Sequence, residues 1–343
     1  MKKTLLVLMG LALFTTSCTK DPIITEPTEK PDNGGGTKPD PKPEEPSEGN
    51  NGNYNIPASY EKYYSKVDFT KEGMQLKQQL AKLVKETHNP QSYTPGIWIA
   101  SEYTDEDPKN TNNVLQIYSW PDIDAKDDIT KKRSVPKEHK NNGSTSLPLT
   151  SLWEREHVFA QSRAVDAQKQ QKKLEAGGEA PALTAIESVA GHDAHHLRAI
   201  NRSTNSSRGN RKFVDSKGNS KTIGTEYYYP GDEWKGDVAR MMMYMHIRYE
   251  NERGGGYTKA TKIGMPIDSK NGILSDEMID LFLKWNAEDP VDDIEKRRNE
   301  YHGNPYNPVY KSSQGNRNPF IDNPELANRI WGGEYKASNL WVK

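Results

Sequence analysis

Residues 153–213 gather side chains that could hold a metal ion and activate water against a phosphate. Four of the eight histidines of the chain lie in this window, together with acids, amides and arginines. Near its start, Glu156 and His157 stand side by side at the beginning of a short apolar run. A carboxylate is a good ligand for Mg²⁺ or Ca²⁺, and histidine is the usual general base near neutral pH. The pair could therefore combine metal binding with proton transfer.

The Glu156-His157 pair is ambiguous by itself, because adjacent residues of a regular strand face opposite ways. Both side chains can serve one phosphate only if the backbone bends between them or if they flank the phosphate. Taken alone, such a pair is more often an ordinary surface dipeptide than a catalytic site. The residues that follow must decide between these interpretations.

A second histidine pair follows Asp193, at His195 and His196. We expect a strand here, with one histidine packed inward and the other directed toward the site. A zinc site is the sharper alternative, but zinc usually takes cysteine or regularly spaced histidine ligands. The chain has no cysteine in this region and no His-x3-His spacing. Zinc is therefore the less favoured interpretation of the pair.

The third part of the window predicts a short helix that begins near Thr204, a plausible N-cap. Asn205 and Arg208 are three residues apart and would share one face of it. An asparagine oxygen suits a Mg²⁺ shell that keeps several waters. Arg208 and Arg198 could each bind a phosphate bidentately. Gly209 lowers the helix propensity, so the helix should be short.

The remaining elements are predicted from periodicity and turn residues. Leu76, Leu80, Leu83 and Val84 mark a helix over residues 73–87, and a methionine-rich stripe marks a core helix over 235–251. Further helices are expected over residues 276–286 and, capped by Asp289, over 290–301. Strands are expected at residues 96–99 and 114–119, and loops at 121–146 and 221–230. Residues 314–322 are too polar for a core and predict a hydrogen-bonded turn at the edge of the domain.

Composition limits the classes of protein that this chain can be. It has 343 residues, enough for one large domain or two ordinary ones, with 33% hydrophobic and 28% charged residues. The net charge of −1 combines −4 in residues 19–53, +2 from the two leading lysines and about +1 in residues 54–343. Such a balance argues against a protein that coats DNA, but not against a local basic cleft. The single cysteine, Cys18, allows no internal disulfide and no thiolate metal site.

The pattern of the first 53 residues predicts segments for export and membrane anchoring. Residues 1–17 have two lysines followed by an apolar run, as in a signal peptide, and the run is too short to span a bilayer. It ends at Cys18, whose position resembles a bacterial lipoprotein cleavage site. We expect Cys18 to be lipidated and to anchor a cell-envelope lipoprotein in the outer membrane. Residues 18–53 are rich in Pro, Glu, Lys and Gly and predict a disordered tether, with the folded domain at 54–343.

The window predicts a strand with Glu156-His157, a long connection, a second strand with His195-His196 and a helix with Asn205. This order resembles the ββα-metal arrangement, which is also called the His-Me finger. The chain as a whole resembles the bacterial endonuclease I family of secreted and periplasmic nucleases. Six motifs in the order of that family carry the resemblance over residues 60–333: 153–159, 193–198, 205–213, 235–240, 289–292 and 314–322. The fold that it implies is α+β, with a ββα-metal core embedded in a mostly helical single domain with short strands.

This resemblance implies an enzyme that cleaves DNA without sequence specificity and often also cleaves RNA. It implies one divalent ion, usually Mg²⁺, with Mn²⁺ or Ca²⁺ as alternatives. It implies that His157 is the general base and that Glu156 and Asn205 hold the metal, giving 5′-phosphate ends. Arg208 is expected at the catalytic site. His195, His196, Arg198 and Arg240 are expected as supporting residues or phosphate contacts, and Arg208 and Arg240 could equally be structural.

Two alternatives stay open. One is an RNA-preferring extracellular ribonuclease of the same fold, and the other is a catalytically silent lipoprotein that binds nucleic acid at the surface. We expect a monomer in each case. In some relatives a catalytic arginine comes from the excursion between the two strands. Here residues 164–192 offer lysines instead, and only Arg163 stands at their start, so that role is not assigned.

Overall fold

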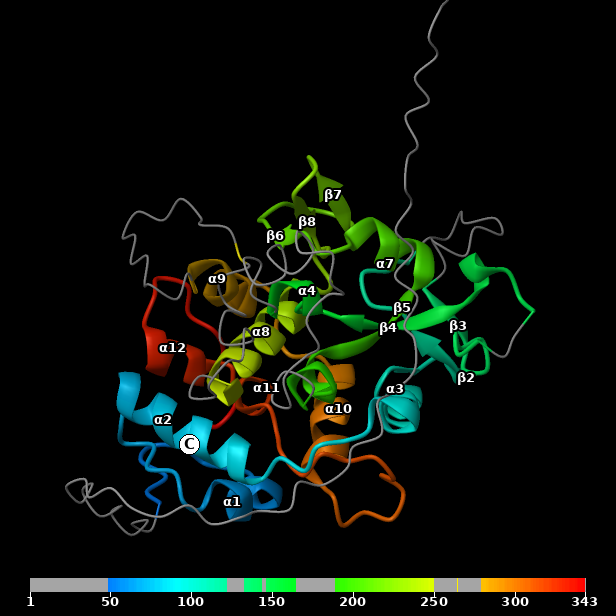
Figure 1. The fold of residues 1–343 in the computed structure, drawn as a ribbon. Coiled ribbons are helices and arrows are strands. Elements are labelled where there is room, and N and C mark those ends of the chain that lie inside the picture. Colours follow the sequence, from blue (N-terminus) through cyan, green and yellow to red (C-terminus); the bar gives the residue numbers. More distant parts are fainter. Residues whose placement is uncertain are drawn as a thin grey trace, which may run out of the picture. The chain divides into compact units, whose positions relative to one another are not determined.

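The computed structural model describes residues 49–121, 133–143, 146–164, 189–249, 264 and 279–342 (Figure 1). The expected signal peptide, Cys18 and nearly all of the tether lie outside these residues, as does most of the excursion 164–192. The described part begins at Gly49, whose amide donates to Ser65 O at 2.9 Å. Residues 49–53 therefore belong to the folded part, because backbone hydrogen bonds hold them although they carry few apolar side chains. None of the described helices is long and apolar enough to cross a membrane.

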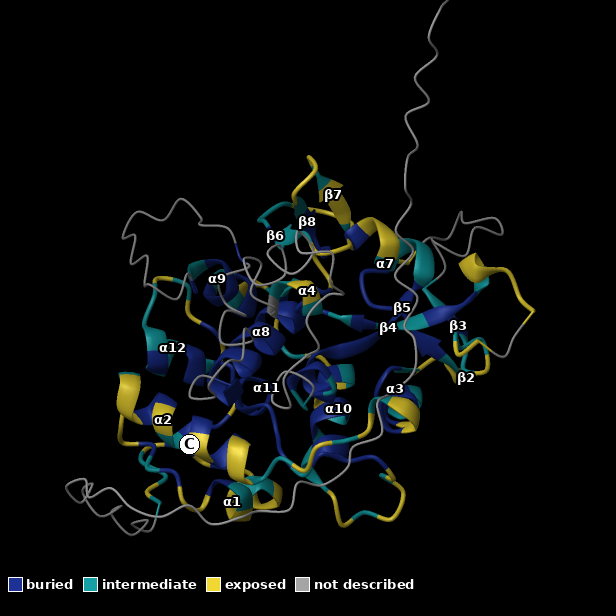
Figure 2. Cartoon of the chain, in the orientation of Figure 1, coloured by how far each residue is buried: buried dark blue, intermediate teal, exposed yellow. Residues whose placement is uncertain are grey.

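Helix α8, Lys235–Tyr249, lies at the centre of the main hydrophobic core. It packs against α2, Gly73–Glu86, and α9, Asp280–Glu288, and α12, Glu325–Trp331, packs against α2 (Figure 1). The predicted stripe of α8 is buried, and so is every other residue from Gly236 to the end of the helix (Figure 2). A helix that is buried all round needs partners for its polar side chains. Some partners come from the C-terminal third of the chain, such as Glu295 for Arg240, and others precede the helix, such as Asp193 for Tyr244.

The helices of the C-terminal third are α10, Asp293–Gly303, α11, Pro319–Asp322, and α12. The predicted cap of α10 was wrong. Asp292, not Asp289, accepts the Glu295 amide at 2.8 Å. The Glu295 carboxylate in turn accepts the backbone amide of Asp292, which completes a capping box. Asp289 instead accepts a hydrogen bond from the Gly236 amide at the start of α8. Pro290 therefore lies in the connection between α9 and α10 and not in the first turn of α10.

Residues 314–318 overturn another expectation, because they are buried in the core and not at an edge. Gln314, Asn316 and Asn318 have no exposed surface. The Asn316 amide donates to Val84 O at 3.1 Å, and the Asn318 amide donates to Arg240 O at 3.0 Å. Polar side chains can be buried when each hydrogen bond is made, and here the amides satisfy backbone carbonyls of two core helices.

The sheets are small, and strand residues such as Ile200, Phe213 and Tyr229 join the helices in the main hydrophobic core. One contains β1, Glu106–Asp107, β2, Asn110–Leu115, and β3, Ser134–Pro136; another has the order β6, Lys212–Phe213, β8, Tyr227–Tyr229, and β7, Lys221–Ile223. The segments 121–146 and 221–230, expected as loops, therefore contain strands. The strand expected at 96–99 is helical, since Trp98 begins α3, Trp98–Thr104, after the helical turn η1, Tyr93–Ile97. A short apolar run does not distinguish the two structures.

The segment that carries the candidate chemistry is a strand pair followed by a helix. Strand β4, Trp153–His157, pairs antiparallel with β5, Leu197–Asn201, with Glu156 opposite Arg198 and His157 opposite Leu197. Helix α7, Arg202–Arg208, follows β5 directly and packs against both strands (Figure 1). Mixed helices and small sheets confirm the α+β class. The short elements α1, Ala58–Tyr64, η2, Leu149–Ser151, α4, Gln161–Ala164, and η3, Ala194–His196, complete the fold.

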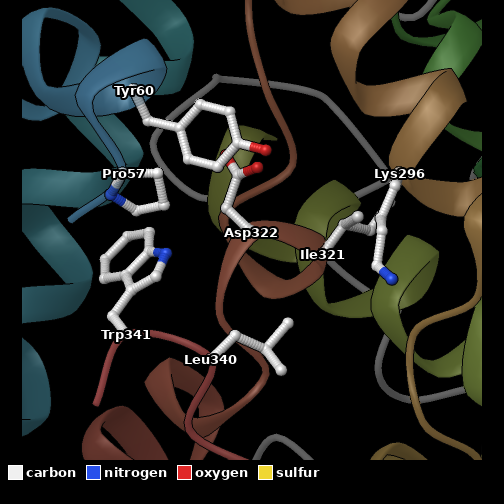
Figure 3. A pocket seen from close by; sticks show the side chains of 7 residues that line it. All are labelled: Pro57, Tyr60, Lys296, Ile321, Asp322, Leu340 and Trp341. Atoms are coloured by element: carbon white, nitrogen blue, oxygen red, sulfur yellow. The ribbon is translucent and has the colours of Figure 1, made fainter. Parts of the chain in front are cut away.

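A small pocket of about 120 Å³ opens away from this segment, and Figure 3 shows its lining side chains. It is lined by Pro57, Tyr60, Lys296, Ile321, Asp322, Leu340 and Trp341. Its acid, Asp322, is engaged by the Arg317 guanidinium through two hydrogen bonds of 2.7 Å. The pocket therefore offers no free carboxylate for chemistry, and none of the expected site residues lines it.

Candidate active site

Strand β4 presents two different faces, because its side chains alternate. Glu154 and Glu156 face helix α7, where they meet Asn205 and Arg208. Trp153, Arg155 and His157 face the other way, toward the aromatic residues of η1 and α3. Glu156 and His157 are the last two residues of β4 and lie on opposite sides of it, which we call the carboxylate face and the histidine face. One phosphate can meet both side chains only where the strand ends, beyond His157.

On the carboxylate face, helix α7 matches the strand residue by residue. Asn205 Nδ2 donates to Glu154 Oε2 at 2.9 Å, and Arg208 Nε lies 3.3 Å from Glu156 Oε1. The expectation that Asn205 and Arg208 share one face of a helix is confirmed. The expected cap Thr204 is wrong, because Asn201 caps the helix by accepting the Ser203 amide at 2.8 Å. An asparagine at the end of β5 can turn the chain into a helix at once.

Glu156 is buried, with 2% of its surface exposed, and it contacts the Tyr118 hydroxyl and the Arg208 guanidinium. The Tyr118 hydroxyl donates to Oε1 at 3.2 Å, on the same oxygen that Arg208 approaches. Burial raises the pKa of Glu156 to about 7, although the Arg208 charge and the Tyr118 hydrogen bond oppose the shift. The carboxyl group therefore titrates near neutral pH, where a metal ion would compete with the proton for it.

Arg208 itself has no exposed surface. Its Nη2 donates to Val158 O at 2.5 Å and its Nη1 to Gly209 O at 2.6 Å, so the guanidinium ties the end of α7 to the chain that follows β4. With these bonds made, Arg208 orients Glu156 and is not exposed to a phosphate. This arrangement favours the structural alternative for this residue over direct contact with substrate.

On the histidine face, His157 Nε2 lies 2.9 Å from the backbone oxygen of Gly191. A carbonyl oxygen can only accept, so Nε2 carries the hydrogen and Nδ1 holds the lone pair. Burial, followed by the neighbouring His196, lowers the pKa of His157 well below its usual value, and the Gly191 hydrogen bond opposes the shift. His157 is therefore neutral at neutral pH, and its Nδ1 can take a proton.

His195 and His196 do not lie on a strand, contrary to expectation. They form the 3₁₀ turn η3, which Asp193 caps by accepting the His195 amide at 2.9 Å. His196 Nδ1 bonds Asp193 O at 2.8 Å, and His195 Nε2 bonds Asn316 O at 3.1 Å. Both rings are almost fully buried, which lowers their pKa values to about 4. These neutral, enclosed rings support the segment around His157 and do not reach a phosphate.

Asp193 is the centre of a buried polar network that the sequence did not reveal. Its Oδ2 accepts the hydroxyls of Tyr244 and Tyr249, each at 2.9 Å, and its Oδ1 accepts Gln314 Nε2 at 3.0 Å. Burial opposes its charge, but His88, His195 and the Gln314 hydrogen bond outweigh burial and hold the pKa of Asp193 below its usual range. The network fixes the turn that leads from Gly191, the partner of His157, into β5.

Arg198 and Arg240 lie in buried ion pairs. Arg198 donates to Asp105 at 2.5 Å and to Asp237 at 2.7 Å. Arg240 makes two hydrogen bonds of 2.6 Å with Glu295. Neither arginine has exposed surface, so neither is placed to contact a phosphate. Removing one partner of such a pair leaves a buried charge, and both arginines therefore hold the fold together.

A metal ion would depend on few protein ligands here. Among the residues that the structure describes, no group of three or more His, Cys, Asp or Glu side chains could hold one. The carboxylate face nevertheless offers the oxygens of Glu156 and, since Nδ2 is held by Glu154, the Oδ1 of Asn205. Mg²⁺ keeps several waters and commonly uses one or two carboxylates together with substrate phosphates. The donor set therefore fits a water-rich Mg²⁺ site.

Sequence comparison agrees with this geometry. Residues 72–325 match the family model described as Endonuclease I. An extracellular ribonuclease of Bacillus amyloliquefaciens is 36% identical over 283 residues, covering 80% of this chain and 79% of that protein. An extracellular ribonuclease of Bacillus subtilis (strain 168) is 34% identical over 286 residues, covering 80% of each chain.

Proposed function

The chain belongs to the endonuclease I family and is a phosphodiester-cleaving hydrolase, and from this premise we propose that it is a metal-dependent, largely sequence-non-specific endonuclease. One observation carries the proposal. Strand β4 places a neutral histidine with its Nδ1 lone pair on one side and a carboxylate with an adjoining asparagine on the other. The β4, β5 and α7 segment supports the assignment of this unit as a ββα-metal core.

In the proposed reaction, His157 Nδ1 takes the proton of a water that attacks the scissile phosphorus. The Gly191 carbonyl keeps Nε2 protonated, so the base acts through one defined nitrogen. Glu156 and Asn205 would hold one Mg²⁺, whose chemistry when bound is to stabilise the charge on the phosphate and on the leaving 3′ oxygen. Arg208 orients the Glu156 carboxylate, and Glu154 orients the Asn205 amide. The products would carry 5′-phosphate ends.

We propose that the enzyme cleaves both RNA and DNA, and the names of two similar proteins support RNA as a substrate. Both similar proteins are named extracellular ribonucleases. Contacts to the sugar-phosphate backbone carry no sequence information, so a site built around one phosphate suits non-specific cleavage. Binding through contacts to phosphates predicts cleavage that weakens as salt rises.

We further propose that the enzyme is exported as a monomeric lipoprotein whose acylated Cys18 tethers residues 54–343 to the cell envelope. The names of the two relatives support secretion. A Cys18→Ser variant should then move from the membrane fraction to the soluble fraction, and metabolic labelling with a fatty acid should be lost. A variant that stays in the membrane fraction and keeps the label would refute the tether.

The direct test of the activity uses the soluble chain without its leader. It should nick supercoiled plasmid and degrade RNA when Mg²⁺ is present, and EDTA should stop both reactions. Absence of cleavage between about pH 6 and 9 with Mg²⁺, Mn²⁺ or Ca²⁺ would refute the proposal. The silent binding alternative predicts nucleic-acid binding without cleavage, unchanged by EDTA and by His157→Ala.

A further inference from the structure

Tyr93, the first residue of η1, stacks on the histidine face of β4. Its ring centroid lies 5.6 Å from that of His157 with an angle of 27° between the planes. It also lies 5.1 Å from the ring of His192 at 19°. Tyr93 precedes His157 by 64 residues in the chain (157 − 93), and no sequence pattern connects the two.

Arg155 holds the same tyrosine ring. Its guanidinium carbon lies 3.4 Å from the Tyr93 ring centroid and 4.2 Å from that of Trp98. Its Nη1 also donates to Tyr93 O and, at 3.1 Å, to Thr94 Oγ1. Arg155 and His157 are two residues apart on one strand face and about 6.6 Å from each other along the backbone. That interval leaves room for an aromatic ring between the two side chains.

The hydrogen bond between His157 Nε2 and Gly191 O fixes one atom of the imidazole but leaves the ring free to tilt about it. A stacked neighbour removes that freedom, because offset parallel rings resist tilting. The direction of Nδ1 depends on this tilt. Proton transfer in turn depends on the direction, and a misplacement of about 1 Å can cost about 100-fold in rate.

We propose that Tyr93, held by Arg155, is a positioning residue that fixes the plane of the His157 imidazole so that Nδ1 faces the reacting water. This inference rests on the proposed role of His157 as the general base. A nucleobase platform is the competing role for a partly exposed aromatic side chain beside the site. The contacts favour positioning, since the Tyr93 ring already stacks with two imidazoles and a guanidinium.

The first test compares Tyr93→Phe with Tyr93→Leu at saturating Mg²⁺. Phenylalanine keeps the stacked ring and should leave kcat within about twofold, whereas leucine should lower kcat by about 10- to 100-fold with little change in KM. Tyr103→Leu is the matched control. Tyr103 stacks with Tyr301 at 5.0 Å near the other end of α3, so its loss should lower thermal stability comparably without lowering kcat. A rise in KM at unchanged kcat would overturn the inference in favour of a nucleobase platform.

The second test is a double-mutant cycle with His157→Ala. If Tyr93 acts through the imidazole, Tyr93→Leu should lower the rate of the wild type but not the residual rate of His157→Ala. Equal losses in both backgrounds would show a general structural effect and overturn the inference, while leaving the proposed function intact. A His157→Ala enzyme with the wild-type rate would overturn the proposed function and this inference with it.

Discussion

On the carboxylate face of β4, Glu154 contacts the Asn205 amide and Glu156 contacts the Arg208 guanidinium. On the histidine face, the His157 ring lies among the rings of Tyr93, His192 and His196. The faces differ in how they treat charge. Burial raises the pKa of Glu156 to about 7 and lowers that of His157 well below its usual value. Strand alternation thus places the proposed metal ligand and the proposed base on opposite faces, at two adjacent residues.

The largest effect should come from the histidine face. His157→Ala removes the proposed base, and the loss of general base catalysis should lower kcat by about 100- to 10,000-fold. Single-turnover cleavage of a short RNA at saturating Mg²⁺ measures this directly. His139→Ala, outside the candidate site, is the matched control and should keep the wild-type rate. A His157→Ala rate within threefold of the wild type would remove the distinction between the two faces.

On the carboxylate face, Glu156→Gln should act through the metal. A neutral amide binds Mg²⁺ more weakly than a carboxylate, so about 100-fold more metal should be needed for the half-maximal rate. High Mg²⁺ should then restore much of the activity. The rate is followed as Mg²⁺ is titrated, and a loss of rate that no metal concentration restores would contradict the assignment.

Glu154→Gln should have a smaller effect, because Glu154 touches the candidate ligand Asn205 and not the metal itself. Loss of this orientation should raise the Mg²⁺ requirement by about tenfold. Glu106→Gln, which alters a carboxylate paired with Lys137 at 2.6 Å in another sheet, provides the control. If both variants shift the metal requirement equally, Glu154 has no specific role.

The last prediction concerns stability and not the rate of cleavage. It follows from the proton that the buried Glu156 carboxyl group holds in the folded protein. Because its pKa is raised from 4.5 to about 7, the folded protein holds a proton in this range that the unfolded chain has lost. Stability from this group therefore falls as pH rises through that window, by on the order of 3 kcal/mol. Glu156→Gln lacks this proton, so its stability relative to the wild type should increase from pH 5 to pH 8 in EDTA. Urea unfolding checks this, and a constant difference would contradict the burial argument.

The sequence predicted the elements that have a regular period or a clear local order. The apolar repeats of α2 and α8 show which residues are buried, and the order of Glu156, His157 and Asn205 led to a strand pair with a following helix. Periodicity could not decide the segment at 96–99, because four apolar residues suit a strand and a helix equally.

The hydrogen bonds and ion pairs between residues far apart in the sequence could not be predicted, for a different physical reason. Gln314 reaches Asp193 across 121 residues, and the two residues have no pattern in common until the chain is folded. A polar segment suggests the surface, yet the amides of residues 314–318 are buried because each one satisfies a core hydrogen bond. The buried ion pairs of Arg198 and Arg240 were beyond prediction for the same reason, because their carboxylate partners lie elsewhere in the sequence.

The separation of the two faces is tested most directly by the Mg²⁺ midpoint of cleavage in wild type, His157→Ala and Asn205→Ala. The account predicts that His157→Ala keeps the wild-type midpoint with a much lower maximal rate. It predicts that Asn205→Ala shifts the midpoint to higher Mg²⁺ by about tenfold or more. A midpoint that moves as far in His157→Ala as in Asn205→Ala, or cleavage that persists in EDTA, would contradict it.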